Sequence, residues 1–224
     1  VQPSSTSLVL DENTSKHVVQ VLRMQKGELL QLTDGRGHIY SCVITDDHRK
    51  KCSVTITQYL QVPAPSTQVC IAISPVKNNS RFEWFLEKAT EIGVTLIVPL
   101  LCERTEKQQL KIERLNGILI SAMLQSQQAW LPVLAPATRF SDYVQQLKDN
   151  SLQKFIAHCE EDQKASLKEM AKGTDCCILI GPEGDFTPKE IEMAVNSGFT
   201  AVSLGATRLR TETAGMVAAV LLSL

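Results

Sequence analysis

Charged side chains that could carry out catalysis gather near the carboxyl end of the chain. Arg208, Arg210 and Glu212 occupy alternate positions in the segment Gly205–Ala214. A guanidinium donates hydrogen bonds to oxygens that gain negative charge during a reaction, and a carboxylate can accept a proton. Two other interpretations remain open: an arginine could pair with Glu183 or Glu212 to fix the loop, and Glu212 could cap a helix.

Two short apolar runs near the carboxyl end each lead into a loop that contains glycine. Cys176–Ile180 leads into Gly181–Gly184, and Ala201–Leu204 leads into Gly205. The first run is typical of a strand buried on both faces. An open α/β sheet binds its ligand at the carboxyl ends of such strands, where glycine lets backbone groups approach a flat molecule. The pair of loops therefore predicts a ligand site, although Gly-Pro-Glu-Gly alone would be an ordinary turn.

Strands and helices alternate in the segment that must position these loops, which predicts a parallel α/β sheet. The clearest helix start follows the first loop, with Thr187 as N-cap, Pro188 in the first turn and Glu190 completing a capping box. The strands are expected at Val69–Ser74, Thr95–Leu100, Phe155–His158, Cys176–Ile180 and Ala201–Leu204. The other helices are expected from Asn79 or Ser80 to Gly93, over Lys107–Trp130 and Ser141–Lys148, near Leu167, and over Ala214–Leu224.

The amino-terminal part has a different pattern, with a short helix at His17–Leu22 and then three strands. These strands are Leu29–Thr33, Ile39–Thr45 and Cys52–Leu60, and their even spacing predicts a small β-barrel. The proline-rich segment Val62–Ser66 is the best linker in the chain. We therefore expect two domains, residues 1–62 and residues 68–224.

At the two glycine loops, Ile180–Gly184 and Leu204–Ala214, the chain resembles the SPOUT methyltransferases, and among them most closely the RsmE family. Further matching segments are Lys88–Val94, Pro99-Leu100, Glu103-Arg104, Gln125-Ser126 and the pattern His17, Val21-Leu22-Arg23, Gly27-Glu28. The resemblance covers nearly the whole chain. It implies a trefoil-knotted, parallel-sheet methyltransferase domain preceded by a PUA-like RNA-binding β-barrel. It also implies S-adenosylmethionine as cofactor, a homodimer, and methylation of N3 of a uridine in 16S ribosomal RNA, within the small ribosomal subunit.

The resemblance, together with the chemistry and charge of the side chains, predicts roles for three groups of residues. The residues expected to bind the cofactor are Leu179, Ile180, Gly181, Pro182, Glu183, Gly184, Leu204, Gly205, Leu209, Thr213 and Ala214. The residues expected to act on the substrate are Arg208, Arg210 and, as a hypothetical proton acceptor, Glu212. The residues expected to contact RNA are His17, Arg23, Lys26, Arg36, Arg49 and Lys50, although such a run of charges also suits a solvated hairpin tip.

Two positions depart from the family pattern. Gln128 stands where the family usually has arginine, and Asp185 stands where it usually has another glycine. If Asp185 needs a positive φ, aspartate tolerates one better than most residues. These departures keep open a non-catalytic RNA-binding or ribosome-assembly protein of the same fold, and a methyltransferase that acts on another RNA is a further alternative.

Composition narrows the class of protein. The 224 residues are 43% hydrophobic and 21% charged, as in a globular protein. No apolar run is long enough to span a membrane, so we expect a cytoplasmic protein without a membrane partner. The net charge of -1 means that any RNA footprint is local. The seven cysteines form no C-x-x-C pair, so we expect no metal. A nicotinamide-dependent oxidoreductase is disfavoured because the G-x-G-x-x-G motif is missing after the first strand.

Overall fold

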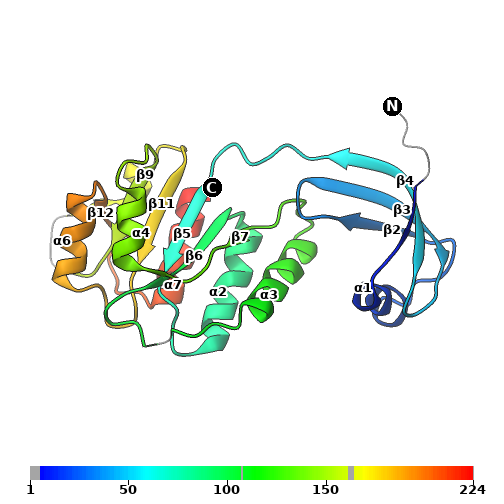
Figure 1. Ribbon diagram of the computed structural model, residues 1–224. Coiled ribbons are helices and arrows are strands. Elements are labelled where there is room, and N and C mark those ends of the chain that lie inside the picture. Colours follow the sequence, from blue (N-terminus) through cyan, green and yellow to red (C-terminus); the bar gives the residue numbers. More distant parts are fainter. Residues whose placement is uncertain (1–5, 107, 161–163, 224) are drawn as a thin grey trace. The chain divides into compact units, whose positions relative to one another are not determined.

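The computed structural model describes residues 6–106, 108–160 and 164–223. The chain folds into two compact units, of which the first ends at Ala64 and the second begins at Pro65 (Figure 1). Each unit has its own hydrophobic core, so each is described by itself.

The first unit is built on a four-stranded antiparallel sheet in the order β1-β4-β3-β2. The strands are β1 (Ser7–Val9), β2 (Leu29–Thr33), β3 (His38–Asp46) and β4 (Ser53–Gln61). The predicted turn joins β2 to β3, and the Asp34 carboxylate fixes it by accepting a 2.8 Å hydrogen bond from the Arg36 backbone N–H. The core residues of this unit are Leu10, Val18, Cys42, Ile44, Cys52 and Val54.

The helical segment of the first unit begins earlier than the expected His17. Helix α1 (Glu12–Lys16) starts at the N-cap Asp11, whose side chain accepts hydrogen bonds from the backbone of Asn13 and Thr14, and the π-helix η1 (His17–Val21) continues it. Strand β1 was not predicted, because its three residues are exposed and too short to show a period. The sequence analysis therefore missed both the N-cap Asp11 and the edge strand β1 near the start of the chain.

Among the described residues, the second unit contains an eight-stranded sheet in which every pairing is parallel. The main order is β10-β12-β9-β11-β5-β6-β7, and β8 pairs separately with β6. The strands are β5 (Val69–Ile73), β6 (Leu96–Leu101), β7 (Val133–Leu134), β8 (Thr138–Arg139), β9 (Gln153–Ala157), β10 (Ala165–Ser166), β11 (Cys176–Ile180) and β12 (Thr200–Ser203). The predicted parallel α/β sheet is confirmed; only β7, β8 and β10, each two residues long, were missed.

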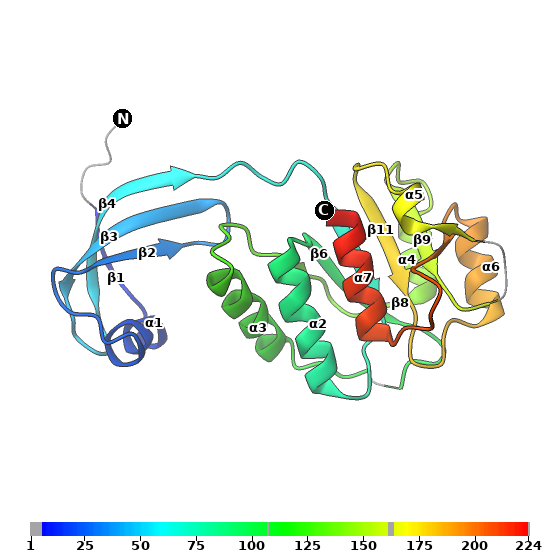
Figure 2. The same ribbon diagram turned by 180° about the vertical axis from the view of Figure 1, so that it is seen from behind.

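Helices cover both faces of this sheet (Figures 1 and 2). They are α2 (Asn79–Ile92), α3 (Ile112–Gln125), α4 (Phe140–Leu147), α5 (Leu167–Met170), α6 (Pro188–Asn196) and α7 (Thr211–Ser223). Strand residues alternate between two cores: Ile178 and Ile180 pack with α2 and α7, whereas Cys177 and Leu179 pack with α4 and α6. Within the described residues, no helix is long and apolar enough to cross a membrane.

Several helix boundaries differ from the predicted ones. Helix α2 is capped by the Asn78 side chain rather than by Asn79 or Ser80, and it ends as predicted at Gly93, which has φ 99°. The helix expected over Lys107–Trp130 is limited to Ile112–Gln125, and Lys107 itself lies outside the described residues. Helix α7 begins at Thr211, so the predicted loop segment Thr211–Thr213 forms its first turn, while Leu224 lies outside the described residues.

Candidate functional site

Two adjoining hollows lie at the carboxyl ends of β9, β11 and β12. The β12 hollow, of about 340 Å³, is lined by Ala157, His158, Cys159, Lys164, Val202, Ser203, Leu204, Gly205, Ala206, Thr207, Arg208, Leu209 and Ala214. The β11 hollow, of about 530 Å³, is lined by Arg81, Ala157, Cys159, Ile180, Gly181, Pro182, Glu183, Asp185, Arg208, Leu209, Arg210, Thr211 and Ala214. The two share five residues, so the structure brings both predicted glycine loops to one site.

The loop after β11 is packed tightly at its first residue. Gly181 is buried, and a Cβ added there would lie 3.1 Å from the ring of Phe186 and 3.2 Å from its backbone nitrogen. Phe186 cannot move aside easily, because it is 2% exposed and its ring lies 5.4 Å from that of Phe140. Only glycine fits this position without displacing the loop.

Asp185 joins the loops that follow β9 and β11. Its φ is 62°. The backbone at this position therefore does adopt the positive φ that the sequence analysis considered for Asp185. One carboxylate oxygen accepts a 2.7 Å hydrogen bond from the Cys159 N–H, and the other accepts a 2.8 Å hydrogen bond from the Phe186 N–H. The departure from glycine therefore adds a direct tether between two walls of the β11 hollow.

A second tether comes from the loop that follows β6. Arg104 donates a 2.6 Å hydrogen bond through Nη1 to the Gly184 carbonyl. Next to it, the backbone N–H of Glu103 donates to Glu190, whose carboxylate also completes the predicted capping box with Thr187. The matching pair Glu103-Arg104 thus holds the loop after β11 in place from outside the hollows.

The loop after β12 depends on glycine for another reason. Gly205 has φ 140°, a conformation that L side chains rarely adopt, although no atom would obstruct a Cβ there. The Ser203 hydroxyl bonds the Gly205 carbonyl at 3.1 Å and accepts from the Gly205 N–H at 3.2 Å. The turn that leads into Arg208 is therefore set locally by these two residues.

Of the three residues predicted to act on the substrate, two line the hollows and one does not. Arg208 lines both hollows and Arg210 lines the β11 hollow; both are exposed, and neither guanidinium has an ion pair or hydrogen bond within the described part of the chain. Glu212 lines neither hollow and is 6% exposed. Its Oε1 lies 3.7 Å from Nε of Arg81. Glu212 therefore forms its ion pair with a residue of α2, and not with Arg208 or Arg210 of the preceding loop.

Eight of the eleven residues expected to hold a cofactor line a hollow. Leu179, Gly184 and Thr213 line neither: Leu179 points into the α4–α6 core, and the Gly184 carbonyl faces Arg104. The remaining eight supply mostly backbone and small apolar groups. At Gly181 and Gly205, a larger residue would strain the backbone or its neighbours. Two adjoining hollows of this size, lined by such loops, fit a flat nucleoside-sized ligand.

Among the lining residues that the sequence analysis missed, four carry a cationic, imidazole or thiol side chain: Arg81, His158, Cys159 and Lys164. Lys164 Nζ lies 3.2 Å from His158 Nδ1 and donates to the carbonyls of His158 and Glu160. The available signal was the position of His158 at the end of a predicted strand and of Cys159 directly after it, because the loop after β9 opens at the same edge as the glycine loops. No group of three or more His, Cys, Asp or Glu in the described residues is arranged to hold a metal ion.

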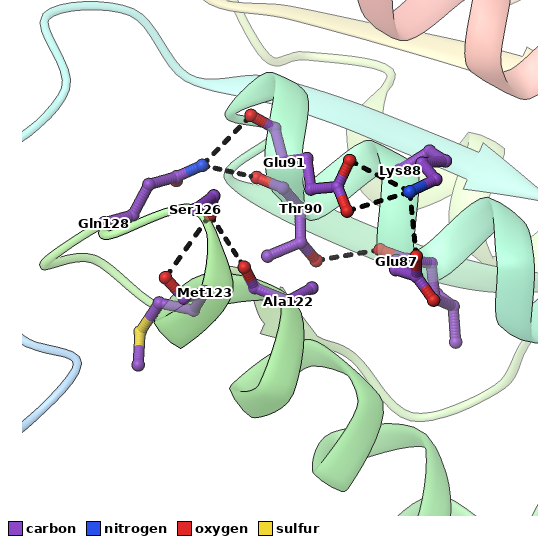
Figure 3. A network of polar contacts seen from close by, with 9 residues as sticks. Glu87, Lys88, Thr90, Glu91, Ala122, Met123, Ser126 and Gln128 are labelled. Atoms are coloured by element: carbon purple, nitrogen blue, oxygen red, sulfur yellow. Dashed lines mark hydrogen bonds and ion pairs between the residues drawn. The ribbon is translucent and has the colours of Figure 1, made fainter.

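Gln128 has a structural contact away from the hollows. Its side-chain amide donates to the carbonyls of Thr90 and Glu91 at 2.8 and 3.1 Å, at the end of α2 (Figure 3). Nearby, Lys88 pairs with Glu87 and Glu91 on the same helix. The glutamine thus adds hydrogen bonds to the last turn of α2, where the Thr90 carbonyl also accepts from the Gly93 N–H. The Lys88 segment forms the amphipathic helix and its cap.

The six residues expected to contact RNA are all exposed in the first unit, but they do not form one group. The turn with Arg23 and Lys26 lies beside the β3–β4 hairpin with Arg49 and Lys50, because the Lys26 N–H faces Asp47 and the Gly27 N–H bonds the Ile44 carbonyl. Lys50 also pairs with Glu12 of α1, close to His17. Arg36 lies at the other end of β3 from these residues. A nine-residue strand is roughly 30 Å long, so Arg36 is about that far from the β3–β4 hairpin.

Comparison with known proteins gives consistent results for both units. A family model described as an RNA methyltransferase domain matches residues 63–223, and one described as an RNA methyltransferase PUA domain matches residues 10–57. The curated relative named ribosomal RNA small subunit methyltransferase E from a Synechocystis species is 32% identical over 209 residues, which are 90% of this chain and 68% of that protein.

Two crystal structures share the fold over almost the whole chain. A probable rRNA methyltransferase from Porphyromonas gingivalis is 41% identical with a TM-score of 0.87, and the match covers 96% of this chain and 91% of that one. A ribosomal RNA small subunit methyltransferase E from Neisseria gonorrhoeae, bound to S-adenosyl methionine, is 26% identical with a TM-score of 0.87. That match covers 96% of this chain and 90% of the other.

Proposed function

The chain belongs to the RsmE family of S-adenosylmethionine-dependent ribosomal RNA methyltransferases, and on that basis we propose that it methylates N3 of a uridine in 16S ribosomal RNA. One observation supports this most strongly: the two glycine loops and the loop after β9 enclose adjoining hollows at the carboxyl edge of the parallel sheet. A parallel sheet binds nucleoside-containing ligands at that edge.

The cofactor's adenosine part is held, in this proposal, by backbone groups of the two loops. Ile180–Glu183 form one side, and Leu204, Gly205 and Leu209 form the other, with Ala214 at the base of both hollows. When bound, S-adenosylmethionine supplies a methyl group that an attacking nitrogen can take in an in-line displacement. Orientation of the reactants recovers roughly 7–11 kcal/mol, whereas a general base typically contributes about 10²–10⁴-fold. The rigid loops are therefore the main catalytic contribution of this chain.

Arg208 and Arg210 act on the nucleotide side. Uracil N3 must lose its proton, and the resulting negative charge spreads to the flanking carbonyl oxygens. Both arginines lie at the hollows with no competing partner in the described residues, which favours this role over the alternative of fixing the loop. A hydrogen bond to a charged group contributes about 1.5–3 kcal/mol net.

The two departures from the family pattern do not favour a protein without activity. Asp185 has the φ that a glycine could adopt, and its carboxylate tethers the loops. Gln128 bonds the end of α2 and lines neither hollow. Neither residue replaces a group that the proposed chemistry requires.

The remaining expectations extend the proposal. We expect residues 1–62 to bind RNA as a PUA-like domain, through the group formed by His17, Arg23, Lys26, Arg49 and Lys50, and residues 68–224 to carry catalysis and the trefoil knot. We also expect a homodimer that acts on the small ribosomal subunit in the cytoplasm. Apolar side chains of α7 that are only half-buried, such as Met216, Val217 and Val220, support association of two copies.

The test is methylation of intact small subunits and of naked 16S ribosomal RNA with labelled cofactor, followed by mapping of the modified base. We expect label at N3 of one uridine. Label on another atom or another RNA would refute the assigned product. Cofactor binding without any transfer would favour the non-catalytic alternative.

A further inference from the structure

Arg81 lies at a position where its own helix does not stabilise a positive charge. It is in the first turn of α2, which contains no acidic residue. The N-terminus of a helix carries partial positive charge, which repels a guanidinium. The carboxylate of Glu212, whose Oε1 lies 3.7 Å from Nε of Arg81, offsets this unfavourable placement.

Glu212 is buried, and only one of its two carboxylate oxygens has a partner in the described residues. Its side chain is 8% exposed, and Oε1 lies 3.7 Å from Nε of Arg81. Its second oxygen, Oε2, has no hydrogen-bond partner in the described residues. The first turn of α7 stabilises the negative charge. A buried carboxylate with an unpaired oxygen is unfavourable by itself, so the cation at Arg81 is the contact that stabilises it.

The Arg81 guanidinium has further donors, and the residue lines the β11 hollow. Within the described residues, this side chain forms an ion pair through Nε alone, and it is 41% exposed. Arg81 lines the β11 hollow together with Arg208 and Arg210. A guanidinium has five N–H donors, so a carboxylate can hold one side of it while the other side contacts a ligand.

We propose that Arg81 is a third substrate-contacting arginine, which binds an anionic oxygen of the bound ligands, and that Glu212 is the positioning residue that holds it. This inference rests on the proposed methyltransferase function. The oxygen can belong to the carboxylate of S-adenosylmethionine, to an RNA phosphate, or to the uracil ring as it loses its proton. Glu212 lines neither hollow, so this role replaces that of a proton acceptor.

The first test is Arg81→Gln, measured in the full-length protein with an active wild type as reference. Three quantities separate the sources of the oxygen: the Kd of S-adenosylmethionine by calorimetry, the Kd of 16S ribosomal RNA, and kcat at saturating concentrations of both. We expect one of them to worsen by about tenfold or more, the effect of losing a hydrogen bond to a charged group. The matched control is Arg114→Gln, because Arg114 also pairs with a glutamate of α2, Glu83, but lines neither hollow.

The second test separates positioning from simple structural support. Glu212→Gln should worsen the same quantity as Arg81→Gln, and the double variant should be no worse than the stronger single variant. Arg81→Lys should restore part of the loss, because it keeps the charge but not the planar set of donors. A general loss of stability would not produce this pattern in one kinetic or binding quantity.

The outcomes are distinguishable from those of the proposed function. If wild-type protein transfers methyl groups and Arg81→Gln changes all three quantities less than twofold, this inference is wrong and the proposed function stands. If Arg81→Gln is impaired but Glu212→Gln is not, the assignment of Glu212 is wrong. If wild-type protein transfers no methyl group to RNA, both proposals fail together.

Discussion

Replacing Gly181 by alanine tests whether the backbone of the first glycine loop shapes the ligand site. The added Cβ would lie 3.1 Å from the Phe186 ring and 3.2 Å from its backbone nitrogen, closer than ordinary contacts. The ring is fixed by burial and by Phe140, so the loop itself must move by a few tenths of an ångström. Overpacking of this kind costs about 1–3 kcal/mol.

That strain must appear in one of two measurable quantities. If the loop relaxes in the free protein and must return to its original geometry to bind, the Kd of S-adenosylmethionine rises by about 5- to 150-fold. If the loop cannot relax, the free energy of unfolding falls by the same about 1–3 kcal/mol. Calorimetric titration and denaturant unfolding of the same sample measure both.

The matched control for Gly181→Ala is Gly117→Ala in α3, where no atom lies within 4 Å of an added Cβ. There we expect unchanged cofactor affinity and a gain of about 0.5–1 kcal/mol in stability, because alanine favours the helix over glycine. If Gly181→Ala matched Gly117→Ala in both assays, our account of the loop would be wrong.

Three further changes test other parts of the molecule. Arg210→Ala should lower kcat at saturating RNA by about tenfold or more without changing RNA affinity; a pure loss of affinity would contradict its catalytic role. Iodoacetamide at pH 8 should label Cys159, which is exposed at both hollows, and S-adenosylmethionine should protect it; Cys176 should stay unlabelled because burial raises its pKa to about 11. Asp11→Ala should destabilise the first unit by about 1 kcal/mol at pH 7, measured by denaturant unfolding. Hydrogen bonds from Thr14 lower the pKa of Asp11, so this difference should persist above the unfolded-state pKa and disappear as the pH falls through the folded-state pKa.

The sequence predicted the parallel sheet because its longer strands and some of its helix starts carry a local signal. β5 and β11 are continuous apolar runs, and the capping box at Thr187 marks the start of α6. The helix predicted from Lys107 was too long, because its polar first residues carry no cap and α3 begins only at Ile112. Strands of two residues, such as β7 and β8, lie below the length at which any period can be recognised.

The ligand loops were predictable for the same reason, whereas the contacts between them were not. Glycine after a buried strand is visible in the sequence, so Gly181 and Gly205 were expected in the site. Nothing local indicates that Arg81 faces Glu212, or that Asp185 bonds the backbone of Cys159. These pairs form only once the sheet order places distant segments side by side. The one available signal was an arginine in the first turn of a helix, which is electrostatically unfavourable.

The hydrogen bonds that tether the loops of the site lie apart from the two cores of the second unit. Arg104 and Asp185 connect one exposed loop to another, and their hydrogen bonds contribute little to the two cores that hold the sheet together. Removing such a bond should therefore loosen the hollows more than it weakens the fold. By contrast, Gly215 is buried in α7, where a Cβ would lie 2.7 Å from Ile73 and Phe85, so substitution there should destabilise the whole unit. We therefore expect substitution of Arg104 or Asp185 to weaken cofactor binding more than it lowers the free energy of unfolding.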